Sequence, residues 1–268
     1  MKNFIFSLIQ LSAVLFFSAF TIINCHAQEL ELDSVQIKMI KSLGHEQLQL
    51  MIERQISYSS AEDQAKFKHA TEILKLENPA VETVVLKNKT VKFIPISHAA
   101  QKKFYENLSK IIKDHKKEGY VVFYEQMKAT KASSEVDTLR LKFRKILPVE
   151  PTRKMFSLIT LAYPDVIAQP EYDQLGITDK DVNADITIAE YIAQYEKLYG
   201  PIKLEPCDFE TKPGAGKCKQ LQNNLDAITI DFRNTTVANM IKASKNKKIL
   251  VVYGAQHIPG IKELIQKR

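Results

Sequence analysis

Hydrophobic and polar positions follow two different periods along this chain, and the two periods predict an ordered series of strands and helices. Alternating, β-branched runs predict strands over Val81–Leu86 and Thr90–Ile96, and the turn between them predicts a hairpin. Two more apolar runs predict strands at Tyr120–Glu125 and from Ile249 to Tyr253. The expected helices are Glu46–Tyr58, Glu62–Leu76, Lys102–Lys117, Asp137–Ile146, Met155–Tyr163, Ile188–Leu198, Gln222–Ser244 and Pro259–Lys267.

This order of elements predicts an α/β fold with helices flanking a sheet. A helix joins the hairpin to the strand at Tyr120–Glu125, and the right-handed crossover rule makes that strand parallel to Thr90–Ile96. Between the later helices we expect a loop or lid over Ile167–Gly176 and a short extended piece at Asp181–Thr187.

The first 27 residues predict a secretory signal peptide. A short basic start precedes an apolar run over Phe4–Ile23, and Cys25-His26-Ala27 supplies small residues at positions −3 and −1 of a cleavage site. Cleavage before Gln28 would release a periplasmic or secreted protein with no membrane span. Two alternatives stay open: a lipoprotein anchored through Cys25, and an uncleaved anchor, because the run is long enough to span a bilayer.

The remaining length, residues 28–268, suits one large α/β domain or two small ones. We expect a single domain whose core starts at about residue 81. The net charge is +7, and the lysines fall on helix faces such as Lys110–Lys117 and Lys242–Lys248. Lysines spread in this way are typical of solvated surfaces, and no arginine-aromatic platform accompanies them, so we expect no nucleic-acid partner.

Two cysteines remain after removal of the signal peptide. Cys207 and Cys218 flank a Pro- and Gly-containing stretch, and no histidine lies near them in the sequence to complete a metal site. In an oxidising compartment this pair predicts a disulfide that closes the loop.

Candidate chemistry gathers where strands end. His98 follows the strand at Thr90–Ile96, His257 follows the closing strand, and Glu125 ends the strand between them. Open α/β sheets keep their ligand crevices at the carboxyl ends of strands, so these side chains are expected to converge. Two imidazoles and a carboxylate can bind a divalent metal or perform acid–base chemistry. Arg233, on the helix before the closing strand, could polarise a carbonyl or bind an anion.

Four short segments resemble the TraB/TIKI superfamily, also called GumN-like, which is related in fold to ChaN and erythromycin-esterase-like proteins. They are Gly254-Ala255-Gln256-His257-Ile258-Pro259-Gly260-Ile261, Arg233-Asn234, Phe123-Tyr124-Glu125 and Val182-Asn183-Ala184-Asp185. The resemblance covers about Val81 to Arg268. One departure is Pro95, which stands where the first family motif has glycine and therefore fixes φ and removes an N–H.

The resemblance implies a two-repeat mixed β-sheet domain flanked by helices, with the site between the halves. It also implies a manganese- or cobalt-like ion held by His98, Glu125 and His257, with Gly254, Asn234 and Asp185 in binding roles. The family's chemistry is diverse, so the fold does not select a substrate.

Two functions are consistent with these residues. The first is an exported metal-dependent hydrolase of a peptide or ester bond, in which His98, Glu125, His257 and Arg233 form the catalytic set and a metal-bound water is the nucleophile. The second is a non-catalytic exported binding or signalling module on the same fold, which Pro95 favours. A serine hydrolase fits less well, because the chain has no Gly-x-Ser-x-Gly elbow.

Overall fold

The structure, a computed structural model, describes residues 42–128, 133–147, 159–210, 218 and 221–267. These residues divide into two compact units. The larger unit comprises the described residues of Ala80–Ile96, Ser109–Glu150 and Tyr172–Arg268, and the smaller comprises those of Met1–Pro79, Ser97–Leu108 and Pro151–Glu171. A single domain over residues 28–268 stays a prediction.

A mixed five-stranded sheet forms the centre of the larger unit. Its strands, in spatial order, are β1 (Glu82–Leu86), β2 (Lys89–Ile96), β7 (Lys248–Gly254), β4 (Val121–Tyr124) and β6 (Val182–Asn183). The β1–β2 hairpin is antiparallel, and all the other pairs are parallel. The predicted α/β class is therefore confirmed at this level. The predicted parallel relation of β2 and β4 is also observed, with β7 inserted between them.

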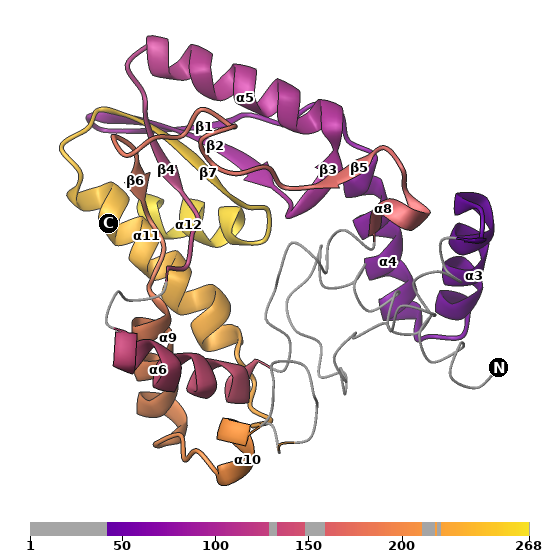
Figure 1. Cartoon of the computed structure of the whole chain (residues 1–268). Coiled ribbons are helices and arrows are strands. Elements are labelled where there is room, and N and C mark those ends of the chain that lie inside the picture. The colour runs from indigo at the N-terminus through magenta and orange to yellow at the C-terminus, as the bar shows by residue number, and fades with distance from the viewer. Residues whose placement is uncertain (1–41, 129–132, 148–158, 211–217, 219–220, 268) are drawn as a thin grey trace. The chain divides into compact units, whose positions relative to one another are not determined.

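Helices cover both faces of this sheet (Figure 1). On one face lie α11 (Arg233–Ala243) and α12 (His257–Gln266), and on the other lies the part of α5 (Lys102–Lys117) that belongs to this unit, from Ser109 onward. The first face is an apolar core, because alternate residues of β2, β4 and β7 meet buried side chains of α11 and α12. Its strand residues are Val91, Phe93, Phe123, Ile249, Val251 and Tyr253, and its helix residues include Val237, Ile241, Ile258, Ile261 and Ile265.

The larger unit also contains α6 (Ser133–Ile146), α9 (Ile188–Tyr199) and the short helix α10 (Pro206–Glu210). A capping box starts α9, since the Thr187 side chain accepts from Glu190 N–H while the Glu190 carboxylate accepts from Thr187 N–H. The expected disulfide is present: Cys207 of α10 and Cys218 are joined at 1.97 Å. The sequence had suggested a loop at Cys207, whereas five residues there form a helical turn.

Among the described residues, the smaller unit contains three whole helices, the first part of α5 (up to Leu108) and a two-stranded sheet. Its elements are α3 (His45–Ser57), α4 (Ala61–Leu74), α8 (Ile159–Ala162), β3 (Ala99–Gln101) and β5 (Val166–Ala168). Both strands are only three residues long, and β5 replaces the start of the expected loop at Ile167. The helix expected over Met155–Tyr163 is described only from Ile159, and its first part lies outside the described residues.

A π-helical turn, η1 (Ala227–Phe232), runs directly into α11. One long helix had been expected from Gln222 to Ser244, but Leu221 to Leu225 are not helical.

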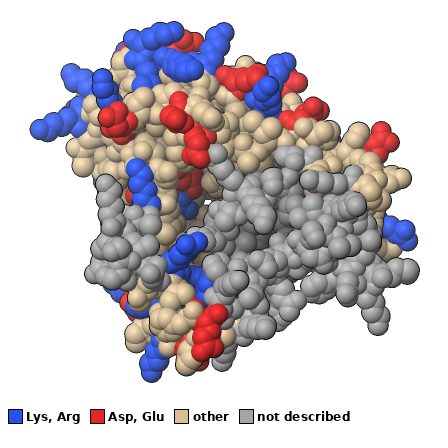
Figure 2. Space-filling view, in the orientation of Figure 1, with Lys and Arg blue, Asp and Glu red and all other residues tan. Residues whose placement is uncertain are grey.

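None of the helices in the described part of the chain combines the length and apolar composition needed to cross a bilayer. Acidic side chains are interspersed among the lysines and arginines in the upper part of Figure 2.

Candidate functional site

Three parallel strands of the larger unit bring polar residues to the same edge of the sheet. Glu125 directly follows β4, Gly254 ends β7, and Asp185 follows β6 by two residues. Because β7 pairs with β4 and β4 pairs with β6, all in parallel, their carboxyl ends are neighbours. The next helix of the chain starts at His257, so the imidazole is held at this edge by the first turn of α12.

A buried arginine joins two of these strand ends. The guanidinium of Arg233 donates from Nε and Nη2 to Asp185, at 2.9 and 2.8 Å, and from Nη2 to Glu125 Oε1 at 2.5 Å. Arg233 is 8% exposed and Glu125 7%. Burial opposes the charge of the guanidinium, but the carboxylates of Glu125 and Asp185 outweigh it and hold the pKa of Arg233 well above its ordinary value. The cluster is therefore a fixed cation between two carboxylates.

The backbone of Gly254 holds the second oxygen of Glu125. Its N–H donates to Glu125 Oε2 at 2.6 Å. A Cβ on Gly254 would lie 2.8 Å from that oxygen and 3.4 Å from His257 Cδ2. A glycine is therefore needed three residues before His257, because only a residue without a Cβ lets the Glu125 carboxylate come this close to the backbone.

The imidazole of His257 is oriented by the residue after the arginine. Asn234 Oδ1 lies 2.7 Å from His257 Nδ1, and both residues are buried. An amide oxygen accepts, so Nδ1 carries the hydrogen and Nε2 holds the lone pair of the neutral ring. Nε2 lies 3.8 Å from Glu125 Oε1, which is beyond hydrogen-bond distance. A Cβ on Gly260 would lie 2.4 Å from Asn234 Nδ2, so this glycine makes room for the amide.

The π-helical turn lies immediately before Arg233 and Asn234. Both residues are buried, although consecutive helix positions ordinarily point about 100° apart. They reach different partners: Arg233 contacts the ends of β4 and β6, whereas Asn234 contacts the start of α12. π-turns occur frequently at functional sites, and the periodicity of the sequence gave no sign of this one.

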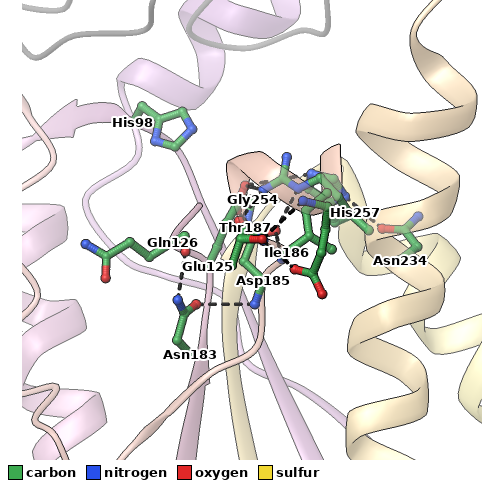
Figure 3. Close-up of polar contacts among 12 residues, drawn as sticks. His98, Glu125, Gln126, Asn183, Asp185, Ile186, Thr187, Asn234, Gly254 and His257 are labelled. Carbon is green, nitrogen blue, oxygen red and sulfur yellow. Dashed lines mark hydrogen bonds and ion pairs between the residues drawn. The ribbon is translucent and has the colours of Figure 1, made fainter. Parts of the chain in front are cut away.

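Additional contacts fix the loops that carry the two carboxylates (Figure 3). The Asn183 side chain donates to Gln126 O at 2.8 Å and accepts from Asp185 N–H at 3.2 Å. The Tyr172 hydroxyl donates to the backbone carbonyl of Glu125, and its ring lies 4.8 Å from that of Tyr124. The backbone on both sides of the cluster is therefore held by hydrogen bonds.

Six of the predicted site residues meet in this cluster: Glu125, Asp185, Arg233, Asn234, Gly254 and His257. His98 belongs to the smaller unit, where its Nδ1 lies 3.3 Å from Gln169 Oε1. Its predicted role with Glu125 and His257 stays a prediction. A catalytic or binding role for the other six residues likewise stays a prediction.

The donors of the larger unit do not fit a divalent metal. Within either unit, the described residues include no group of three or more His, Cys, Asp or Glu arranged to hold one. Glu125 binds Arg233 and Gly254 N–H, while Asp185 binds Arg233 and accepts from Ile186 N–H. A guanidinium 2.5 Å from Glu125 would also repel a cation at that carboxylate. The metal set implied by the resemblance would therefore need His98.

Sequence reasoning missed two members of the cluster. The pattern of the sequence marks Tyr253 only as a strand residue, yet its ring lies 5.1 Å from that of His257 and 5.8 Å from the Arg233 guanidinium. Its phenol ends an otherwise aliphatic run of buried strand residues, and that contrast was a usable signal. Gly260 belongs to the closing motif, and the position of the Asn234 amide shows why a glycine is needed there.

No family model, no curated protein and no solved structure matches this chain. The resemblance to the TraB/TIKI superfamily therefore rests on the short segments quoted above and stays a prediction.

Proposed function

We propose that the protein is an exported hydrolase of a peptide or ester bond, with its reacting groups at the carboxyl edge of β4 and β7. One observation supports this most directly: an oriented imidazole, a carboxylate and a buried guanidinium converge there, at His257, Glu125 and Arg233. These are the group types that general acid–base hydrolysis of a carbonyl compound requires.

In this proposal His257 is the general base. Its Nδ1 donates to Asn234, so Nε2 is the nitrogen that accepts a proton from water as the water attacks the carbonyl carbon. Glu125, held by Arg233 and Gly254, stabilises the imidazolium that forms. The imidazolium then returns the proton to the departing alcohol or amine, so the protons balance without a covalent enzyme intermediate.

Arg233 would stabilise the oxygen of the attacked carbonyl. Its Nε and Nη2 are taken by the two carboxylates, and its Nη1 has no hydrogen-bond partner among the described residues. A guanidinium so fixed needs little reorganisation as negative charge develops on a substrate oxygen. The metal-dependent form of the hypothesis requires His98 and stays a separate prediction.

A non-catalytic binding module is the second candidate, and one observation favours it. Arg233 and Asp185 satisfy each other through two hydrogen bonds, and the Asp185 side chain is fully buried. Such a network can hold three strand ends together without any chemistry. In this case His257 would orient a ligand rather than move its proton.

Hydrolysis assays on the purified exported protein separate the two candidates. The wild type, His257→Gln and Asn234→Ala are tested on panels of chromogenic esters and peptides, with and without a chelator. We expect hydrolysis by the wild type and a loss of about 10²-fold or more in kcat for His257→Gln, because the base is gone. Tyr195→Phe, a buried change on α9, is the control for folding effects. Hydrolysis that survives in His257→Gln, or absence of hydrolysis in the wild type, would refute the mechanism.

The compartment is part of the proposal. The Cys207–Cys218 disulfide is compatible with an exported protein, and it does not distinguish a periplasmic from a secreted one. Intact-mass measurement on protein from the cell envelope should give Gln28 as the first residue. A diacylglycerol mass on Cys25 would support the lipoprotein instead, and a mass that includes Met1 would exclude cleavage.

A further inference from the structure

Two segments far apart in the sequence form a lysine-rich end of the larger unit. The first is the turn of the β1–β2 hairpin, Lys87-Asn88-Lys89, and the second is the connection between α11 and β7, Ser244-Lys245-Asn246-Lys247. Thr90 N–H donates to Lys247 O at 2.8 Å, so the two segments are in contact. Both lie where β7 starts, whereas the candidate site lies where β7 stops (Figure 1).

The ammonium of Lys89 fastens the hairpin turn to the end of α11. It donates to three backbone carbonyls, those of Ile241 at 2.7 Å, Lys242 at 2.8 Å and Ser244 at 2.5 Å. The last carbonyls of a helix have no partner within the helix and carry partial negative charge, so a cation is favourable there. The position of the hairpin turn beside the α11–β7 connection is therefore fixed.

Two further lysines at this end also bind carbonyls at the ends of helices. Lys242 donates to Lys267 O, just after α12, at 3.1 Å, and Lys248 donates to Glu118 O, just after α5, at 2.8 Å. These two lysines, like Lys89, thus have a structural role.

Three other lysines at this end have no such role. Their side chains are exposed, and their ammonium groups bind no acceptor among the described residues: Lys87, Lys245 and Lys247. Neither segment contains an acidic residue. The acids on the last turns of the neighbouring helices, Asp114 and Glu263, are paired with Lys117 and Lys267 at 2.9 and 2.6 Å. The lysine-rich end therefore carries positive charge that the fold neither uses nor neutralises.

We propose that this lysine-rich end binds the surface of a membrane that carries anionic phosphate headgroups. Lysine is a hydrated point charge on a flexible stem, so it is attracted to such a surface without needing a fixed geometry. Val85, two residues before Lys87, is 77% exposed and adds apolar area beside the charges, as interfacial contacts require. Neither segment contains an aromatic side chain on which a base could stack, which disfavours a nucleic acid.

This inference goes beyond the proposed hydrolysis and does not depend on it. β7 runs from Lys248 at the lysine-rich end to Gly254 beside Glu125. When the lysine-rich end contacts a membrane, the edge of the sheet that carries Glu125 and His257 faces away from it. The candidate site would then be open to the compartment rather than to the lipid.

Vesicle flotation with the purified mature protein tests the proposal. The wild type and a Lys87→Glu, Lys247→Glu variant are mixed with vesicles of phosphatidylcholine alone, or of equimolar phosphatidylcholine and phosphatidylglycerol. The wild type should float only with the anionic vesicles, and high salt should release it because salt screens exposed charges. Each lysine near an anionic surface contributes about fivefold in affinity, so the variant should bind about 25-fold more weakly, or weaker still.

Lys197→Glu with Lys203→Glu is the matched control. Both positions are exposed, lie at or after the end of α9, and give the same change in net charge. This control should keep most of the binding, and equal losses in the two variants would overturn the proposal, because net charge alone would then explain the binding. Equal thermal midpoints check folding, and the corresponding glutamine variants replace the glutamates if a midpoint falls.

Three other results would also overturn the proposal. The first is absence of flotation with the anionic vesicles. The second is release by inorganic phosphate beyond that caused by chloride at the same ionic strength, which would indicate a site for free phosphate. The third is tighter binding to a single-stranded oligonucleotide than to the vesicles, which would assign the lysine-rich end to nucleic acid.

Discussion

Glu125 and Gly254 stand at the ends of neighbouring parallel strands, and the Gly254 N–H donates to Glu125 Oε2 at 2.6 Å. This single bond fixes one oxygen of the carboxylate, so the other points at Arg233 Nη2. The backbone of the last strand thereby sets the direction of a side chain from the middle of the chain. It also explains chemically why a glycine precedes the histidine by three residues.

Gly254→Ala should destabilise the protein and displace Glu125. The added Cβ would lie 2.8 Å from Glu125 Oε2, and relief of this clash should cost about 1–3 kcal/mol of unfolding free energy. Urea denaturation measures the loss. In a Glu125→Ala background the same substitution should cost clearly less, because the atom it meets is gone. Full additivity of the two losses would contradict this account.

Gly260→Ala should change the hydrogen bonding of His257 although the two do not bond each other. The new Cβ would lie 2.4 Å from Asn234 Nδ2, so the amide must move and its contact with His257 Nδ1 should break. Nitrogen-15 chemical shifts of the imidazole report which nitrogen carries the hydrogen. We expect Gly260→Ala and Asn234→Ala to alter the His257 shifts in the same way. An unchanged spectrum for Gly260→Ala would show that Asn234 is not held by this glycine.

Much of the fold follows from local patterns, and what does not is set by long-range pairing. The hairpin, α5 and the two later strands of the larger unit lie close to the expected residues, because each has a clear period and a turn at its end. The insertion of β7 between β2 and β4 could not be predicted, since strand order depends on contacts between distant segments. The three-residue strands β3 and β5 are too short to show a period.

In the candidate site, too, local patterns predict some features, whereas others depend on long-range strand pairing. Glu125 and His257 were expected at strand ends, and the sheet does bring those ends together. That Asp185 shares Arg233 with Glu125 was not predictable, because it depends on β6 pairing with β4. A two-repeat organisation and convergence with His98 stay predictions.

The disulfide should contribute measurably to stability. Cys207 and Cys218 are 11 residues apart, and a loop of that size gains roughly 2–3 kcal/mol from closure. Cys207→Ser with Cys218→Ser should lower the unfolding free energy by about this amount, and a reductant should have no effect on the double variant. Thiol labelling of the unfolded, unreduced protein should find no reactive group at either position. Two labelled thiols would show that the bond does not form in the exported protein.

Glu196 should make the protein sensitive to acid. A hydrogen bond from Lys142 lowers the pKa of Glu196 below its ordinary value of 4.5, burial partly opposes this, and Ile202 N–H adds to it. A carboxyl with a lowered folded pKa adds stability that is present above pH 4.5 and is lost as the pH falls through the folded pKa. The free energy of unfolding, measured from pH 6 downward, should therefore fall less steeply in Glu196→Gln than in the wild type. Parallel pH profiles would mean that Glu196 does not contribute.

Lys145→Met should be far more damaging than Lys142→Met, although both residues lie on α6 and pair with acids. Lys145 and Asp208 are each 5% exposed at the side chain and lie 2.6 Å apart, whereas Lys142 and Glu196 are 24% and 28% exposed. Removing one partner of a buried pair leaves an unpaired charge and costs about 3–5 kcal/mol. Loss of a partly exposed pair costs up to about 1 kcal/mol.

Chemical denaturation of the two variants gives the comparison. Lys145→Met combined with Asp208→Leu should recover part of the loss, because the stranded carboxylate is then removed. Asp208 lies next to Cys207 on α10, and Lys145 lies on α6, so this pair attaches the disulfide-bearing helix to the rest of the larger unit. Equal losses of unfolding free energy in Lys145→Met and Lys142→Met would show that burial does not strengthen the Lys145–Asp208 pair.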